Sequence, residues 1–336
     1  MHNGNTLTTG AIASQENKMK SKSIKYLTTL LALSPIALAT SMAFAGGDIS
    51  FHAKEAYPES VSWSASQKVF MVSSVKQGVV GKLTTDGKYT PFIFDSNLVS
   101  SVGLKVDDKR NTLWVTNSDP GVGARTATAT QGKLAGVASY NATTGKPLAY
   151  YDLGKLTEGT HFANDLTLDA EGNVYVTDSF SPVIYKITKA GKTSVFAQSD
   201  MFKGEGFNLN GIAWHQDGYL LVGKYNSGEL FRVNIKNPTE ITHIQLQSPL
   251  KGADGFHLIE GNRLVIVQNL GADRTVQLVS TDGWKTASIE REKKSLKSMP
   301  TAATQAGDSV YVLNASFDTL FNKDAPKVSN YILQKF

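Results

Sequence analysis

The chain of 336 residues contains no cysteine. This absence excludes a disulfide framework, a thiolate metal site and a cysteine nucleophile. Only 19% of the residues are charged and 41% are hydrophobic, a composition that excludes a disordered chain and is sufficient for a large apolar core. The sequence also has no basic run interleaved with aromatic residues, so nothing in it indicates a nucleic-acid partner.

Residues 1–45 have the pattern of a targeting segment. Three lysines at positions 20–25 precede an apolar run at 27–39, and an Ala-x-Ala sequence ends at Ala45. This order is typical of a secretory signal peptide, and we expect cleavage after Ala45. The alternative, a membrane anchor, is disfavoured because Thr, Ser and Pro interrupt the run, which is shorter than the ~20 residues that a membrane span needs.

We therefore expect residues 46–336 to be a single exported domain, periplasmic or secreted, with no membrane contact after cleavage. Residues 1–18 form an upstream extension, and Met19 is an alternative start. The formal charge of the whole chain is +5. Residues 1–45 hold four lysines and one glutamate, so they carry +3 of this charge and the expected domain carries +2.

One hairpin pattern recurs six times along the expected domain. The clearest copy is His161–Ser179, in which a polar pair, a short alternating strand, a tight turn and a second alternating strand follow one another. The copies open at residues 59, 102, 164, 210, 254 and 301. The steps between them, 43, 62, 46, 44 and 47 residues, are in the range of blade-sized β repeats.

Each copy continues with further short β-type runs separated by Gly, Asp and Asn turns, as in Val79–Leu83 and Tyr89–Phe94. We see no amphipathic helix after residue 45. Four strands per repeat predict an all-β fold, a six-bladed β-propeller. The lone strand Ile49–Ala53 is expected to close the last blade beside the C-terminal strand Val328–Lys335.

Two segments are longer than the repeat requires. Ser118–Gly136 follows the second strand of the second repeat, and Phe317–Lys327 occupies the equivalent place in the last. In a propeller both loops would lie over the face where the first strands open, which indicates a partly covered pocket mouth. The alternative for the longer segment is a flexible surface insertion.

The opening residues of the six repeats should form a ring around the central channel. They are Glu59, Val102, Asn164, Asn210, Asp254 and Thr301. Carboxylates crowded in a low-dielectric channel are costly unless they are protonated or neutralised by a cation. A set of carboxylate and amide oxygens suits a hard divalent ion such as Ca²⁺ or Mg²⁺, and substrate or water would complete its coordination.

Each of these residues also has an ordinary structural interpretation. Asn or Asp at a strand start is commonly a turn former that satisfies local backbone groups. Four polar residues at one register of a repeat favour the metal site. His161 and His257, each three residues from a polar opening, are candidate acid–base groups or buried structural histidines. Asp165 is either structural or supports Asn164.

The order of these motifs resembles the senescence marker protein/gluconolactonase (regucalcin-like) family of six-bladed propellers. Glu59 and Trp63 keep the family's Glu-to-Trp spacing. The pairs Asn164-Asp165, Asn210-Gly211 and Asp254-Gly255 follow in the family's order. The resemblance spans essentially all of residues 49–336.

The resemblance implies that Glu59, Asn210 and Asp254 bind one divalent cation, with Ca²⁺ most expected and Mg²⁺, Mn²⁺ or Zn²⁺ as alternatives. It implies that Asn164 lines the pocket and that Asp254 is the general base. Paraoxonases share the fold and a similar calcium site. The expected activity is therefore hydrolysis of lactones and other esters.

Two departures from the family pattern bear on the substrate. Ser60-Val61 replaces Gly-Pro, and Phe162 stands where the family often has an Arg that contacts sugar hydroxyls. Phe162, with His161 beside it, is therefore expected to face a less polar lactone or ester. A non-catalytic propeller that binds a ligand or a protein, and a lyase acting on cyclic esters, remain as alternatives. No heptad pattern indicates an oligomer, so a monomer is expected.

Overall fold

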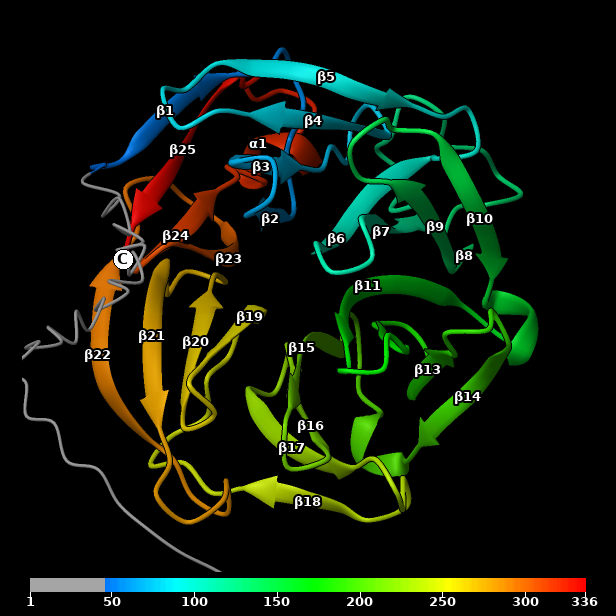
Figure 1. Ribbon diagram of the computed structural model, residues 1–336, viewed down its shortest axis with the longest axis vertical. Coiled ribbons are helices and arrows are strands. Elements are labelled where there is room, and N and C mark those ends of the chain that lie inside the picture. The colour runs from blue at the N-terminus through cyan, green and yellow to red at the C-terminus, as the bar shows by residue number, and fades with distance from the viewer. Residues whose placement is uncertain (1–45) are drawn as a thin grey trace, which may run out of the picture. The chain divides into compact units, whose positions relative to one another are not determined.

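The computed structural model describes residues 46–336, so the signal segment expected at 1–45 lies outside the described residues. Six β-sheets surround a central axis, and the first strand of each repeat lies nearest that axis (Figure 1). The first three blades are β2 (Val61–Ser64), β3 (Val69–Val72), β4 (Val79–Leu83) and β5 (Tyr89–Phe94); β6 (Ser100–Asp107), β7 (Thr112–Ser118), β9 (Gly136–Asn141) and β10 (Pro147–Asp152); and β11 (His161–Leu168), β12 (Val174–Asp178), β13 (Val183–Ile187) and β14 (Thr193–Gln198).

The remaining blades follow the same plan. They are β15 (Leu209–His215), β16 (Tyr219–Lys224), β17 (Glu229–Asn234) and β18 (Ile241–Ile244); β19 (Ala253–Ile259), β20 (Arg263–Gln268), β21 (Arg274–Val279) and β22 (Ser288–Lys294); and β23 (Pro300–Ala306), β24 (Ser309–Asn314), β25 (Asn330–Lys335) and β1 (Ile49–His52). The all-β, six-bladed propeller expected from the repeats is confirmed.

The turns between strands are encoded locally. In the β11–β12 hairpin, the Asp169 carboxylate accepts hydrogen bonds from the backbone N–H groups of Gly172 and Asn173 at 2.9 and 2.8 Å. Gly172 has φ +92°, a conformation that side chains other than glycine rarely adopt. The Asp and Gly of this turn therefore fix where the first strand ends and the second begins.

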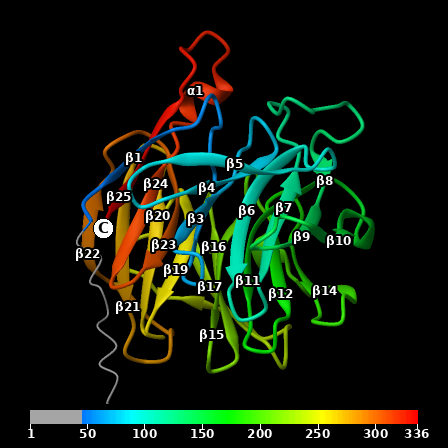
Figure 2. The ribbon, with the colours of Figure 1, turned by 45° about the horizontal axis from the view of Figure 1, so that its top comes forward.

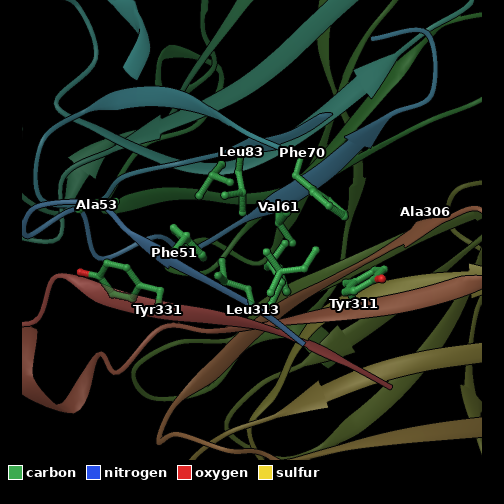
Figure 3. Close-up of a cluster of buried hydrophobic side chains, with 14 residues drawn as sticks. Phe51, Ala53, Val61, Phe70, Leu83, Ala306, Tyr311, Leu313 and Tyr331 are labelled. Carbon is green, nitrogen blue, oxygen red and sulfur yellow. The ribbon is translucent and has the colours of Figure 1, made fainter. Parts of the chain in front are cut away.

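The last blade closes the ring as the sequence predicts. β1 pairs antiparallel with β25, with Phe51 opposite Tyr331, so strands from the two ends of the domain lie side by side (Figure 1). Side chains from this blade and from the first blade form one buried apolar cluster (Figure 3). In it the Phe70 and Tyr311 rings pack edge to face with centroids 5.4 Å apart. Apolar burial of this kind stabilises the closed ring at roughly 25 cal/mol per Å².

Three details differ from the sequence-based expectation. The segment 118–136 contains a short strand, β8 (Lys133–Leu134), which pairs parallel with β11. The segment 317–327 contains one helical turn, α1 (Asp318–Phe321). Two further single turns, η1 (Gly154–Leu156) and η2 (Asp200–Phe202), lie between blades.

None of the helices in residues 46–336 is long and apolar enough to span a membrane.

The two long loops rise above the same face of the propeller (Figure 2). The longer loop, residues 118–136, is stabilised by hydrogen bonds within itself, which argues against a flexible insertion. Its Asp119 carboxylate accepts hydrogen bonds from the hydroxyls of Thr126 and Thr130 at 2.7 and 2.6 Å and from the backbone N–H groups of Gly121 and Ala127 at 2.9 and 3.2 Å.

Candidate functional site

Five of the six opening residues lie within the inner strands, at β-bulges, whereas Glu59 precedes β2. In five blades the pairing between the first and second strands shifts register across the opening residue and its successor. The shifts lie between Ser101 and Leu104, Ala163 and Leu166, Leu209 and Ile212, Ala253 and Phe256, and Pro300 and Ala303. A bulge redirects a side chain at the point where ladder pairing is interrupted. The expectation that these residues stand at strand starts is therefore wrong in these five blades.

Neighbouring inner strands approach very closely at the bulges. A Cβ on Gly211 would lie 2.1 Å from the carbonyl oxygen of Asp254, so no larger residue fits there without a shift of the backbone. Thr177 Oγ1 donates a hydrogen bond of 2.7 Å to the carbonyl of Asn210, and Thr116 Oγ1 donates one of 2.7 Å to that of Asn164. The backbone that carries the ring of polar side chains is thus held from blade to blade.

A pocket of about 540 Å³, including its open mouth, lies at this end of the channel. Its size is in the range of small-molecule sites. The lining residues are Glu59, Val75, Val102, Pro120, Phe162, Asn164, Phe207, Asn210, Tyr225, Asp254, Asn269, Met299, Phe317 and Phe321. The structure therefore brings together five of the predicted site residues, the exception being His161. Thr301 of the predicted ring does not line the pocket.

Three buried oxygens of this pocket have no hydrogen-bond partner: Oδ1 of Asn164, of Asn210 and of Asp254. For Asn164 and Asp254, neighbouring side chains set this orientation. Asn164 Nδ2 donates to Ser179 Oγ at 2.9 Å, and Asp254 Oδ2 accepts from Asn269 Nδ2 at 2.6 Å. A buried acceptor without a partner costs about 1–3 kcal/mol. Three such acceptors in one pocket fit a cation, because a cation would give each oxygen the electrostatic partner that no donor in the described residues provides.

The electrostatics of the pocket also favour a bound cation. Burial raises the pKa of Glu59 well above its usual range, and the nearby charges of Asp254 and Asp165 raise it further. Burial and the Asp165 charge also raise the pKa of Asp254, while the side-chain amides of Asn269 and Asn210 partly offset the rise. A divalent cation would relieve this repulsion and hold both carboxylates ionised.

In residues 46–336 no three or more His, Asp or Glu side chains are grouped to hold a metal ion. A cation site here therefore depends on amide oxygens beside the two carboxylates. Glu59, Asn210 and Asp254 fit this requirement as hard oxygen donors, with Asn164 Oδ1 beside them.

Asp165 and His257 do not line this pocket. Asp165 lines a separate small cavity with Lys105. Burial raises the pKa of Asp165 to about 6, and the Lys105 charge opposes that rise. Burial and the same lysine lower the pKa of His257 to about 4, and its Nε2 lies 3.3 Å from Gln305 Oε1. His257 thus has no contact with the pocket.

The expectation that His161 contacts substrate is not supported by its position. Its Nδ1 lies 2.9 Å from Asp178 Oδ2, and its Nε2 lies 3.1 Å from the carbonyl oxygen of Thr157. Both ring nitrogens donate to these partners only when the imidazole is protonated. The hydrogen bond with Asp178 raises the pKa of His161 accordingly. His161 is a structural residue that ties β11 to β12 and to the segment before it.

The residues that hold the backbone of the ring were not predicted from the sequence. Two equivalent second strands finish with Thr116-Asn117-Ser118 and with Thr177-Asp178, which Ser179 follows directly. The Thr and Ser hydroxyls donate to backbone carbonyls of the next inner strand. The recurrence of Thr-x-Ser was a usable signal. Asn269, which donates to Asp254, had no comparable sequence signal, because the second strand of its blade ends at Gln268, directly before Asn269, and not in Thr-x-Ser.

The apolar wall of the pocket was not predicted either, apart from Phe162 and Val102. It comes mostly from loops, which have no repeat. Phe207 precedes β15, and Phe317 and Phe321 belong to the α1 segment. The Phe162 ring packs against Phe180 and Phe207 with centroids 5.4 and 5.2 Å away.

No protein-family model and no curated protein sequence matches the chain. Solved structures do. The chain is similar to the major allergen Mala s 1 of Malassezia sympodialis, with 19% identity over 86% of this chain and 95% of that chain and a TM-score of 0.69. The fold is a six-bladed β-propeller.

Two similar structures are enzymes. A gluconolactonase from Xanthomonas campestris is 14% identical over 86% of this chain and 89% of its own, with a TM-score of 0.58. A virginiamycin B lyase from Staphylococcus aureus is 14% identical over 86% and 99%, with a TM-score of 0.56. The expected resemblance to gluconolactonase propellers is confirmed at the level of the fold.

Proposed function

We propose that this protein is a divalent-metal-dependent hydrolase of lactones and related esters. The observation that carries the proposal is the group of unpartnered buried oxygens beside two carboxylates of raised pKa. Glu59, Asn210 and Asp254 would hold the ion. Calcium suits their oxygen donors best, with Mg²⁺, Mn²⁺ or Zn²⁺ as alternatives. A gluconolactonase with the same fold supports the reaction class.

The bound cation would polarise the ester carbonyl and offset negative charge that develops on its oxygen. Asp254 is the proposed general base, which removes a proton from the attacking water. Its Oδ2 is fixed by Asn269 and its Oδ1 is unpartnered. Asn164 Oδ1, whose amide nitrogen is held by Ser179, would accept a hydrogen bond from the attacking water or join the oxygen donors to the cation. Phe162 lines the pocket and limits access of bulk water to these groups.

We further propose that the protein is exported, to the periplasm or the medium, and acts as a monomer. The signal-peptide pattern of residues 1–45 supports export. N-terminal sequencing of the secreted protein tests it: a mature chain beginning at Gly46 is expected.

Metal content and thermal unfolding of the purified domain test the metal. We expect one divalent ion per chain, a lower Tm in EDTA and recovery with Ca²⁺. A ligand at 100 times its Kd adds about 2.7 kcal/mol of stability, which is several degrees of Tm for a domain of this size. No ion and no shift with Ca²⁺, Mg²⁺, Mn²⁺ or Zn²⁺ would refute the mechanism.

A panel of lactones and aryl esters, followed by proton release and product mass, tests the reaction. Hydrolysis adds water to the product, whereas a lyase leaves the mass unchanged and creates a double bond. A stoichiometric metal without turnover of any substrate would favour the non-catalytic binding propeller.

A further inference from the structure

The polar and apolar parts of the pocket are segregated. The polar side chains gather at one end, where Glu59, Asn164, Asn210 and Asp254 come from the inner ends of four blades. The remaining lining residues are Val75, Val102, Pro120, Phe162, Phe207, Met299, Phe317 and Phe321, none of which has a side chain that forms ordinary hydrogen bonds.

Two further polar residues line the pocket, and both are already engaged. The Tyr225 hydroxyl donates to Asn269 Oδ1 at 2.5 Å. The Asn269 amide nitrogen donates to Asp254 Oδ2 at 2.6 Å. Neither the hydroxyl proton of Tyr225 nor the oriented amide of Asn269 is therefore left to serve a substrate hydroxyl.

Part of the wall is backed by a packed aromatic group. The Phe180 and Phe207 rings lie 4.9 Å apart, and both contact Phe162, which is only 5% exposed. Such packing holds the aromatic surface in place before a ligand arrives, so little rotamer freedom remains to be lost on binding.

The mouth of the pocket is apolar as well. Phe321 of α1 lines the pocket yet is 53% exposed, and Phe317 packs edge to face against it with centroids 6.4 Å apart. α1 stands above the blades on the side of the long loop that carries β8 (Figure 2). That loop contributes Pro120 to the lining. The apolar surface thus continues from the aromatic group out to solvent.

We propose that the substrate is a lactone or ester with a hydrocarbon arm, whose carbonyl lies at the polar end and whose arm lies along the Phe162–Phe207 wall toward Phe321. The proposal rests on the proposed function and specifies its substrate. A polyhydroxylated sugar lactone would lose water from its hydroxyls against walls that supply no partners, which disfavours it. A hydrocarbon arm gains with each buried methylene.

The test measures kcat/KM of the Ca²⁺-loaded protein for γ-butyrolactone, for γ-lactones with butyl, hexyl and octyl arms, and for glucono-δ-lactone. We expect kcat/KM to rise about threefold to fourfold per methylene over the first few methylenes, with glucono-δ-lactone the poorest substrate. Equal rates along the series, or preference for glucono-δ-lactone, would overturn the inference and leave the hydrolase intact.

Two exposed phenylalanines provide a matched pair of variants. Phe321→Ala should lower kcat/KM for the octyl lactone at least threefold more than for γ-butyrolactone, mainly through KM. Phe94→Ala, on the outer strand β5 and 72% exposed, should change neither value. Equal effects of the two variants would overturn the placement of the arm.

Binding of the corresponding γ-lactams, which resist hydrolysis, separates the two levels of the proposal. If no lactone is hydrolysed at any metal concentration, the proposed function fails. Lactam affinity that rises with arm length would still establish the apolar subsite, and affinity independent of arm length would overturn it.

Discussion

His161 and Asn164 are both buried on β11, but they differ in whether the protein satisfies all their hydrogen-bonding atoms. The His161 side chain has partners inside the protein at both ring nitrogens. Asn164 reaches one partner through its amide nitrogen, while its oxygen has none. We call these the satisfied group, which is His161 and Asp178, and the open group, which is Glu59, Asn164, Asn210 and Asp254.

The satisfied group is complete within the chain. Asp178 Oδ1 accepts from the backbone N–H groups of Phe162, Phe180 and Ser181 at 2.9–3.0 Å, and Oδ2 accepts from the Tyr185 hydroxyl at 3.1 Å. Such a group contributes to folding. The open group has acceptors in excess of donors and carboxylates of raised pKa, so it costs folding free energy until a ligand completes it. The number of hydrogen-bond partners therefore distinguishes structural residues from candidate functional residues here better than the residue type does.

The largest effect on folding is expected at the satisfied group. Asp178→Ala should lower the free energy of unfolding by about 3–5 kcal/mol, because it leaves the His161 ring and three backbone donors buried without their acceptor. Denaturant unfolding measures it. A loss below about 1 kcal/mol would contradict the assignment. Tyr185→Phe, which removes only one of the donors to Asp178, is the milder control.

The backbone that carries the open group is expected to be the next most sensitive. Gly211→Ala should cost about 1–3 kcal/mol and weaken Ca²⁺ binding, because the added Cβ would push against the Asp254 carbonyl. Gly47→Ala, where a Cβ meets nothing within 4 Å, is the control. Equal stability of both variants would show that the inner strands can separate without loss.

Asp254→Asn should have the opposite signature to Asp178→Ala. In EDTA we expect equal or higher stability than in the unmodified protein, because a buried carboxyl of raised pKa is replaced by a neutral group of the same shape. The Tm rise with Ca²⁺ and the lactone hydrolysis should both be lost. A normal Ca²⁺-induced rise would remove Asp254 from the ligand set.

The smallest effects are expected in the pH dependence. The pKa of His161 is raised, so its stabilisation is fully present below the unfolded pKa, about 6.5, and is lost as the pH rises through the folded pKa. The stability difference between the unmodified protein and His161→Gln, measured with saturating Ca²⁺, should therefore shrink above about pH 6.5. A difference that grew with pH would contradict the protonated form.

The open group also loses stability as the pH rises in the absence of a cation. Its carboxyl groups have raised pKa values, so the folded state keeps protons that the unfolded state releases above about pH 4. Ca²⁺ should offset this loss and should not affect the His161 component. Thermal melts in EDTA and in Ca²⁺ between pH 5 and 8 compare the two.

Much of the fold was readable because propeller blades repeat. Period-2 alternation and Asp/Gly turns are local properties, so the sequence alone determined six blades, their strand order and closure by Ile49–Ala53 against the C-terminal strand. The same repetition placed Glu59, Asn164, Asn210 and Asp254 at one register. These are consequences of spacing, which folding preserves.

Only the tertiary structure decided which polar side chains have all their hydrogen-bond partners within the protein. His161 and Asn164 look alike in the sequence as polar residues near a strand start, yet Asp178 and Thr157 complete the first, and nothing in the described chain completes the oxygen of the second. The bulges, Asn269 and the phenylalanines of the wall likewise come from segments that meet only in the folded ring. Hydrogen-bond satisfaction is a property of a three-dimensional neighbourhood, so no local pattern encodes it.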